Sequence, residues 1–232
     1  MSDAPVTLIT GGSTGIGATV AEQLLKLGHR VAVTGRTPEK LDTLATGLGN
    51  PEDLLTLPGD AADNDAVEAA VRSTVDRFGR LDHAVANAGF GDFDTVADGD
   101  PGLWRDMVLT NVLGPALLIR AALPELRKTK GRIVLVGSVG GYINIPGSLY
   151  GATKWAVTGL AENTRRLVTA DGVGVTLISP GRTETPFFDR AAGLTGPFLP
   201  VDRLAETMVW AIRQPEGVDV TSLVVRPIGQ PH

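Results

Sequence analysis

The 232-residue chain contains no cysteine and only three histidines. The absence of cysteine excludes disulfide bonds, thiolate nucleophiles and zinc sites with cysteine ligands. The three histidines, His29, His83 and His232, lie far apart in the sequence. We therefore expect no metal site in this protein.

An excess of basic residues is also missing. Lys and Arg total 21 against 26 Asp and Glu, which gives a net charge of −5, and the basic residues are scattered along the chain. Proteins bind nucleic acid through clustered positive charge, so nucleic acid is not an expected partner.

Long apolar runs and an N-terminal leader pattern are absent as well. No apolar run approaches the ~20 residues that a membrane span requires. The segment before Val6 carries neither a basic nor an apolar signal pattern. We therefore expect a cytoplasmic protein with no membrane partner.

The sequence does contain short apolar runs that alternate with amphipathic stretches. Near-continuous apolar runs such as 133–136 indicate strands that are buried on both faces. The alternation predicts an α/β chain with a three-layer, doubly wound Rossmann fold, in which helices cover both faces of a parallel sheet of about seven strands. The predicted strands are 6–10, 30–34, 53–57, 83–86, 132–137, 173–179 and 222–226.

Two helix starts carry the same signal. Thr37-Pro38 and Asp100-Pro101 each predict an N-cap followed by proline at the first helical position. Pro115 and Pro124 interrupt the helical pattern of 103–127. Proline removes a backbone hydrogen bond from a helix interior, so we expect a kink or an early end there.

A glycine-rich turn follows the first predicted strand, with the sequence Thr10-Gly11-Gly12-Ser13-Thr14-Gly15-Ile16-Gly17. Its glycines allow a tight turn, close approach of the backbone to phosphate, and packing of helix on strand. Taken alone, the loop could also be a connector that needs positive φ. Because it lies between a strand and a helix N-terminus, it predicts a pyrophosphate site. Residues 1–232 are thus expected to form a single dinucleotide-binding and catalytic domain.

The spacing T-G-x-x-x-G-x-G resembles that of the short-chain dehydrogenase/reductase family. Other motifs of that family follow in the same order along nearly the whole chain. They are Asp60-Ala61, Asn87-Ala88-Gly89, Asn111, Ser138, the Y-x-x-x-K pair of Tyr150 and Lys154, and Pro180-Gly181 followed by Thr183 and Thr185. The resemblance implies an enzyme that transfers a hydride between a nicotinamide cofactor and a carbonyl compound or secondary alcohol.

The resemblance also implies where the cofactor binds. It places Asp60 beside the adenine ring, Asn87 in a segment that braces the cofactor-side loop, and Thr185 at the nicotinamide carboxamide. The expected cofactor-binding residues are Gly11, Ser13, Thr14, Gly15, Ile16, Gly17, Arg36, Thr37, Asp60, Ala61, Asn87, Ala88, Gly89, Tyr150, Lys154, Pro180, Gly181, Thr183 and Thr185.

The catalytic chemistry can be argued from the residue types. Tyr150 and Lys154 are four residues apart, so on a helix both project from one face. A phenol titrates near pH ~10, and we expect the Lys154 ammonium to lower the Tyr150 pKa so that Tyr150 acts as general acid and base. Ser138 would donate a hydrogen bond to the substrate oxygen. The resemblance adds Asn111, which would hold a water molecule linked to the lysine.

The end of the second predicted strand bears on the choice of cofactor. It reads Thr34-Gly35-Arg36-Thr37, without the acidic residue that binds the ribose hydroxyls in NAD-selective sites. Arg36 could instead pair with the 2′-phosphate of NADP(H), with hydroxyl bonds from Thr34 or Thr37. NADP (NADPH) is the expected cofactor and NAD the less favoured one, although Thr14 stands where many NADP-using relatives carry a basic residue.

The sequence leaves the substrate open between a 3-hydroxy acid and a small ketone. Residues 185–200 combine three Phe, three Pro and two Gly, which predicts a mobile flap over the cleft, with a packed surface loop as the alternative. Arg182 and Arg190 could bind a carboxylate. The tail 214–227 resembles the branch of NADP-dependent serine and 3-hydroxy acid dehydrogenases. Four flap residues would instead suit an apolar ketone: Phe187, Phe188, Leu194 and Phe198.

Two other functions stay open. Sugar-nucleotide epimerases and dehydratases share the Y-x-x-x-K pair and run redox-neutral reactions, although they normally carry a larger C-terminal region. A regulatory protein could also bind NADP(H) without catalysis. By resemblance we further expect a homodimer or homotetramer, formed through the helix that bears Tyr150 and through the last strand and helix.

Overall fold

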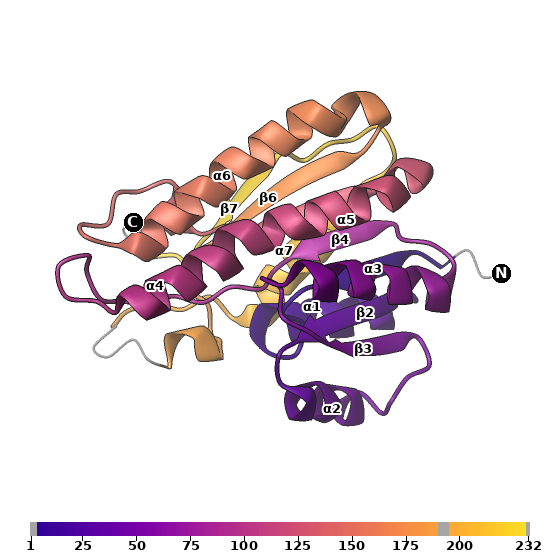
Figure 1. The fold of residues 1–232 in the computed structure, drawn as a ribbon, viewed down its shortest axis with the longest axis horizontal. Coiled ribbons are helices and arrows are strands. Elements are labelled where there is room, and N and C mark those ends of the chain that lie inside the picture. The colour runs from indigo at the N-terminus through magenta and orange to yellow at the C-terminus, as the bar shows by residue number, and fades with distance from the viewer. Residues whose placement is uncertain (1–3, 190–194, 231–232) are drawn as a thin grey trace.

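The computed structural model describes residues 4–189 and 195–230 and has a parallel seven-stranded sheet at its centre (Figure 1). The strand order is β3-β2-β1-β4-β5-β6-β7, and every neighbouring pair is parallel. The strands are β1 Val6–Ile9, β2 Arg30–Gly35, β3 Leu54–Pro58, β4 His83–Ala86, β5 Arg132–Val136, β6 Gly174–Pro180 and β7 Ser222–Val225. Each end lies within one residue of the sequence-based prediction, so the predicted doubly wound fold is confirmed.

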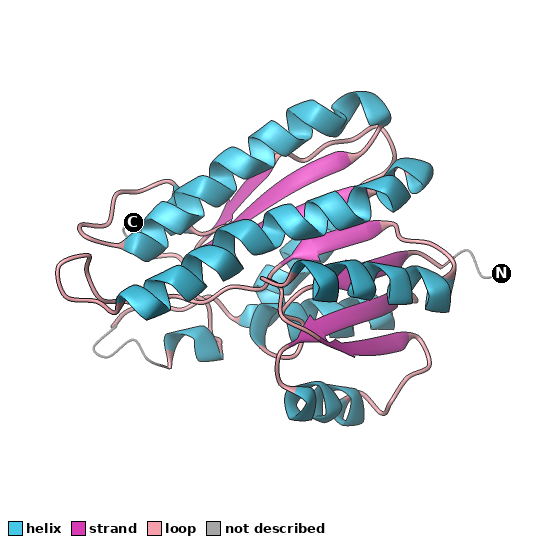
Figure 2. Ribbon diagram, viewed as in Figure 1, coloured by secondary structure: helices cyan, strands magenta, loops and turns pink. Residues whose placement is uncertain are grey.

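Helices cover both faces of this sheet (Figure 2). Helices α3, α4, α5 and α6 lie in front of the sheet in the view of Figure 1, and α7 lies behind it. The main helices are α1 Gly15–Lys26, α2 Pro38–Gly47, α3 Asn64–Phe78, α4 Pro101–Val108, α5 Gly114–Thr129, α6 Leu149–Val168 and α7 Val201–Ile212. The chain therefore forms the three layers that its alternating pattern predicts.

The core has two parts, one on each side of the sheet. Successive strand residues point to opposite faces. Ile133 and Leu135 of β5 therefore pack with α3, α5 and α6, whereas Val134 and Val136 pack with α1, α2 and α7. All four of these side chains are buried. This double burial explains why the strand sequence is apolar without alternation.

The helix from 101 to 129 corrects the expectation of an early end. Helix α4 passes through a π-helical turn, η1 Leu109–Leu113, directly into α5, and α5 continues across Pro124. Pro115 directly follows the π-helical turn, and Pro124 lies inside α5. Packing of α5 against α3 and β4 holds the helix together at Pro124 despite the lost hydrogen bond.

The same helix qualifies the expectation about membrane spans. Over 101–129 it is long and apolar enough to cross a bilayer by length and composition alone. Half of its most apolar window is buried inside the protein, where Leu118 and Leu126 belong to the core. Burial of this kind is what a core helix requires, and the apolar composition is therefore explained by the fold.

The two predicted helix caps differ in the structure. Asp100 caps α4, because its carboxylate accepts a hydrogen bond of 2.8 Å from the Gly102 N–H. Thr37 occupies the N-cap position of α2 but forms no capping bond with its side chain, so that part of the prediction is wrong. Pro38 in the first turn sets the helical φ without a side-chain cap.

Candidate active site

A cleft of about 550 Å³ lies at the carboxyl edge of the sheet. Strands β1 and β4 are neighbours there although they are distant in sequence, and ligands of open α/β sheets bind at such a switch point. The cleft is lined by Gly11, Ser13, Thr14, Gly15, Ile16, Thr34, Gly35, Arg36, Thr37, Lys40, Gly59, Asp60, Ala61, Asn87, Ala88, Gly89, Phe90, Gly91, Leu103, Asp106, Thr110, Val136, Gly137, Ser138, Tyr150, Lys154, Pro180, Gly181, Thr183, Thr185, Pro186, Phe187 and Phe188.

The turn after β1 needs its glycines for close approach. Gly11 has φ +64°, and a Cβ added there would lie 2.7 Å from the Ala88 Cα. A Cβ on Gly17 would lie 2.6 Å from the Asn87 Nδ2. Helix α1 begins at Gly15 without a side-chain cap and without an acidic residue in its first turn. Gly15 and Ile16 of the first turn line the cleft, and the first backbone N–H groups of a helix have no acceptor within the helix, which fits the pyrophosphate of a dinucleotide.

The Asn87-Ala88-Gly89 segment is tied to this turn by hydrogen bonds. The Asn87 Nδ2 donates to the carbonyl oxygens of Thr10 at 3.0 Å and Gly11 at 2.9 Å. The Thr10 Oγ1 accepts from the backbone N–H groups of Asn87 and Ala88, each at 3.2 Å. The turn after β1 and the turn after β4 thus form one connected unit, which is the bracing that the sequence predicts.

At the end of the cleft beside β2 and β3, Arg36 and Thr37 follow β2, and Asp60 and Ala61 follow β3. The Asp60 Oδ1 accepts a hydrogen bond of 2.9 Å from the Ala62 N–H, so this carboxylate is held by its own turn. Ser13 reaches toward β2, where a Cβ on Gly35 would lie 3.0 Å from the Ser13 Oγ.

A second cation at this end was missed by the sequence analysis. Lys40 lies in the first turn of α2, shortly after the Arg36-Thr37 segment, and lines the same cleft. The Lys40 and Arg36 side chains are both exposed. Within 4–189 and 195–230, neither side chain forms an ion pair. The i, i+4 spacing of Arg36 and Lys40 across a helix start was the signal that could have found it.

Tyr150 and Lys154 lie in the first two turns of α6, with both side chains in the cleft. Ser148 caps this helix by accepting a hydrogen bond of 3.0 Å from the Gly151 N–H, which fixes where α6 begins and where Tyr150 points. Ser138 follows β5, and its Oγ accepts from the Gly140 N–H at 3.0 Å. The hydroxyl proton of Ser138 therefore stays available for donation.

The electrostatics of the pair correct the expectation of an acidic phenol. Burial raises the pKa of Tyr150 to about 12, and the Ser138 hydroxyl lowers it only in part. Burial lowers the pKa of Lys154 to about 8. The Lys154 Nζ donates to the Val136 carbonyl oxygen at 2.9 Å and lies 5.7 Å from the centre of the Tyr150 ring. Desolvation therefore dominates the pKa of both groups.

Asn111 lies in the π-helical turn and is buried. Its Nδ2 donates to the Phe90 carbonyl oxygen at 2.9 Å and to the Thr153 Oγ1 at 3.1 Å, and its Oδ1 accepts from the Phe90 N–H at 3.0 Å. The amide group thus connects the turn after β4 to α6, beside Lys154. Its predicted role of holding a water molecule stays a prediction.

The segment after β6 closes the other side of the cleft. Pro180, Gly181, Thr183 and Thr185 all line it. The Thr183 Oγ1 donates to the Gly181 carbonyl oxygen at 3.1 Å, and the Thr185 Oγ1 donates to the Thr183 carbonyl oxygen at 3.4 Å. A Cβ on Gly15 would lie 3.5 Å from the Thr185 Cβ, so this segment contacts the glycine turn.

The predicted substrate flap is described only in part. Arg190 and Leu194 lie outside the described residues. Phe187 and Phe188 belong to a short 3-10 turn, η4 Pro186–Phe188, and both line the cleft. Arg182 does not line it.

Two histidines that are distant in sequence form a pair away from the cleft. The rings of His29 and His83 lie 5.8 Å apart at the amino ends of β2 and β4, and Thr7 of β1 contacts the His83 Nδ1 at 3.1 Å. Burial lowers the pKa of His29 and lowers that of His83 to about 3, so burial favours the neutral form of both rings. Throughout the described part of the chain, no group of three or more His, Asp or Glu residues is placed to hold a metal ion.

Comparison with known proteins identifies the family. The sequence model of the short chain dehydrogenases matches residues 5–192. The chain belongs to this family. An uncharacterised oxidoreductase from Staphylococcus saprophyticus is 32% identical to this short-chain dehydrogenase over 228 residues, which cover 96% of this chain and 97% of that protein.

Solved structures agree with this assignment. An alcohol dehydrogenase from the archaeon Thermococcus sibiricus, complexed with 5-hydroxy-NADP, matches with a TM-score of 0.88 and 28% identity over 98% of both chains. A 3-ketoacyl-(acyl-carrier-protein) reductase from Brucella melitensis, complexed with NADH, matches with a TM-score of 0.87 and 26% identity over 96% of both chains. This protein is therefore an oxidoreductase of the short-chain dehydrogenase type.

Proposed function

We propose that this protein is an NADP(H)-dependent oxidoreductase that interconverts a carbonyl compound and its secondary alcohol, with Tyr150 as the proton-transfer residue. The observation that carries the proposal is the convergence of Tyr150, Ser138 and Lys154 on the same cleft as the uncapped N-terminus of α1. The cleft thus combines an anion site with a proton donor.

When bound, a reduced nicotinamide supplies a hydride, which carries two electrons, to the carbonyl carbon. The Tyr150 hydroxyl gives its proton to the carbonyl oxygen, so that C=O becomes CH–OH. With its pKa raised to about 12, Tyr150 is protonated at neutral pH and ready to act as this acid. Ser138 donates a hydrogen bond to the same oxygen and stabilises the charge that develops on it.

Lys154 supports the proton donor. Its pKa of about 8 leaves the ammonium mostly charged at neutral pH. The positive charge stabilises the phenolate that remains after proton transfer. Its hydrogen bond to the Val136 carbonyl oxygen fixes the ammonium beside the ring.

The preference for NADP(H) over NAD(H) is supported by Arg36 and Lys40, two exposed cations at the end of the cleft where the adenosine ribose belongs. Charge-assisted hydrogen bonds to a phosphate contribute roughly 1.5–3 kcal/mol each. We expect Arg36→Ala and Lys40→Ala each to weaken NADPH binding about 10- to 100-fold. Calorimetric titration with NADPH and NADH measures this. Equal losses for both cofactors would contradict a role in recognising the 2′-phosphate.

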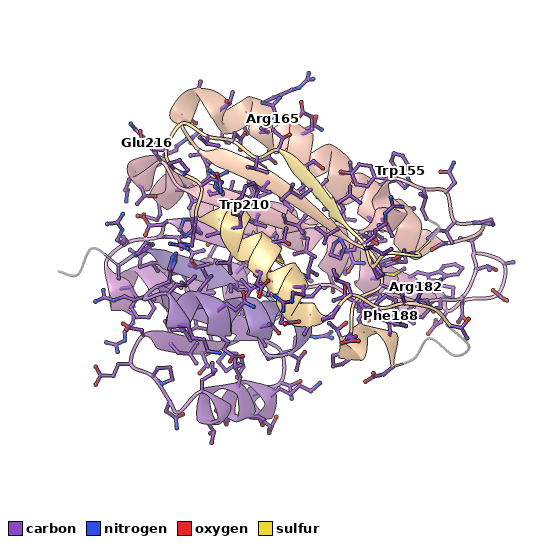
Figure 3. All side chains as sticks on the ribbon, turned by 180° about the vertical axis from the view of Figure 1, so that it is seen from behind. Trp155, Arg165, Arg182, Phe188, Trp210 and Glu216 are labelled. Atoms are coloured by element: carbon purple, nitrogen blue, oxygen red, sulfur yellow. The ribbon has the colours of Figure 1, made fainter. Side chains whose placement is uncertain are left out.

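Assembly as a homodimer or homotetramer is part of the proposal. Trp155 on α6, Val224 on β7 and Trp210 on α7 are about half exposed, so each of the three elements expected at the interface carries an exposed apolar side chain. Figure 3 labels Trp155 and Trp210. Light scattering coupled to size-exclusion chromatography tests this. A monomer at micromolar concentration would refute it.

The decisive experiment is turnover of NADPH against a panel of ketones, β-keto esters and hydroxy acids. Net oxidation of NADPH with formation of the alcohol is expected, and Tyr150→Phe should abolish it. Titration of this variant with NADPH separates loss of proton transfer from loss of cofactor binding. Redox-neutral conversion of a sugar nucleotide would identify an epimerase or dehydratase instead. Binding without turnover of any compound would identify a regulatory protein.

A further inference from the structure

The substrate end of the cleft is built from aromatic rings that come from two distant segments. Phe187 and Phe188 of η4 pack edge-to-face, with ring centres 4.9 Å apart. Phe93, from the segment after β4, lies 6.0 Å from Phe187 and 6.2 Å from Phe188. Phe198 packs against the outer side of Phe188 at 5.4 Å. Four of the six phenylalanines of the chain therefore gather at this one end of the cleft.

Phe187 is the ring that reaches the reacting groups. Its centre lies 5.5 Å from the centre of the Tyr150 ring. On its other side, a Cβ on Gly91 would lie 2.6 Å from the Phe187 Cζ, so the ring fills the space that any larger residue at 91 would occupy. The aromatic ring is thus held between the turn after β4 and the proton donor.

Lys154 is the only cation at this end among the described residues that line the cleft, and its ammonium already donates to the Val136 carbonyl oxygen. The other basic residues that line the cleft are Arg36 and Lys40, beside β2. Arg182, the described candidate for a carboxylate partner, donates from Nη1 to the Thr195 carbonyl oxygen. In Figure 3, Arg182 and Phe188 are labelled at the same end of the molecule, yet only Phe188 lines the cleft.

From this arrangement we infer that the preferred substrate is a neutral ketone, or the matching secondary alcohol, whose apolar and preferably aromatic group packs on Phe187. Carboxylate substrates are disfavoured. This inference rests on the proposed function and names its substrate class. Among the described residues, a carboxylate at this end would meet no cation other than Lys154, which already donates to the Val136 carbonyl oxygen, and it would lose its water. An aryl or branched alkyl group gains edge-to-face and apolar contacts with the ring.

A matched pair of substrates tests the charge. Methyl 4-oxo-4-phenylbutanoate and 4-oxo-4-phenylbutanoate present the same ketone with and without a negative charge. We expect kcat/KM with NADPH to be at least about 100-fold higher for the ester. Equal values, or a preference for the carboxylate, would overturn the inference while leaving the proposed oxidoreductase function intact.

Variants of the aromatic cluster test the role of Phe187. Phe187→Ala should raise KM for the ester at least about 10-fold, with a smaller effect on kcat, whereas turnover of butanone should change less than about threefold. Phe187→Leu keeps an apolar side chain and should recover part of the loss. Phe198→Ala removes a ring of the same cluster that does not line the cleft, and should leave the ratio of ester to butanone unchanged.

The outcomes separate the two levels of the proposal. If Phe187→Ala lowers kcat/KM for the ester and for butanone by the same factor, the ring is merely structural and the inference fails. If the unmodified enzyme binds NADPH, measured by fluorescence transfer, but reduces neither ester, carboxylate nor butanone, the proposed function fails and the inference fails with it.

Discussion

The contact between Gly11 and Ala88 makes a quantitative test of the cofactor turn possible. Gly11 has φ +64°, and replacing it by alanine places a Cβ 2.7 Å from the Ala88 Cα, a backbone atom that cannot rotate away. The left-handed conformation costs a non-glycine residue roughly 1–2 kcal/mol. Overpacking costs about 1–3 kcal/mol more. Gly11→Ala should therefore lower the free energy of unfolding by about 2–5 kcal/mol.

Two other glycines provide matched controls. Gly28 has φ +80° but nothing within 4 Å of an added Cβ, so Gly28→Ala should cost about 1–2 kcal/mol from the backbone alone. Gly47 lies in α2 at an ordinary φ with nothing within 4 Å, so Gly47→Ala should stabilise by up to about 1 kcal/mol. Comparing the three variants separates the close contact from the backbone strain.

Urea unfolding followed by circular dichroism measures these free energies, and titration calorimetry measures NADPH binding. Gly11→Ala should also weaken NADPH binding at least about 30-fold, because the turns after β1 and β4 must move apart, whereas Gly28→Ala should leave the Kd unchanged. If Gly11→Ala and Gly28→Ala are equally stable, the close contact contributes nothing and the geometric argument is wrong.

Three further predictions concern buried polar groups. Burial lowers the pKa of Lys154 to about 8, so below pH 8 the buried ammonium lowers the free energy of unfolding. Lys154→Met should therefore raise the free energy of unfolding by about 1–3 kcal/mol in urea denaturation, and it should abolish NADPH oxidation. The pKa of His83 is lowered to about 3 from the value of 6.5 that applies in the unfolded chain, so protons bind preferentially to the unfolded chain in this window. Stability should fall as pH drops from 6.5 toward 3, by up to about 1.4 kcal/mol per pH unit, and His83→Gln should flatten that slope in urea titrations at several pH values. Asn111→Leu removes the hydrogen bonds to Phe90 and Thr153 and leaves their polar groups unpaired. This should lower the free energy of unfolding by about 2–4 kcal/mol in the same assay. An unchanged unfolding midpoint would refute the bridging role of Asn111.

The inner strands β1, β2, β4, β5 and β6 could be predicted from the sequence because each is an apolar run of ordinary strand length that is buried on both faces. The edge strands β3 and β7 are only partly buried, and their apolar residues sufficed to predict them. The cleft could be predicted because its residues follow strand ends, and the carboxyl ends of parallel strands meet at one edge. The loop residues Gly11, Asn87 and Thr185 therefore come together for topological reasons alone.

The rest depends on three-dimensional packing. Helix α5 continues across Pro124 because tertiary contacts compensate for a lost backbone hydrogen bond. The pKa of Tyr150 was predicted in the wrong direction because sequence spacing shows a neighbouring charge but not the burial around the hydroxyl. His29 and His83 lie close together because β2 and β4 are both neighbours of β1 in the sheet, an order that the sequence does not show.

The π-helical turn at Leu109–Leu113 sets the phase of the helix that follows it. A π turn holds one residue more than an α turn, and each residue rotates an α-helix by about 100°. With the extra residue, Asn111 faces the Phe90 backbone and Thr153. Gly114, three positions later, faces Ala61, and a Cβ added to Gly114 would lie 2.9 Å from the Ala61 carbonyl oxygen. Loss of a single residue here would restore regular winding and turn one of these two faces away from its neighbour, so the length of this segment is as constrained as its composition.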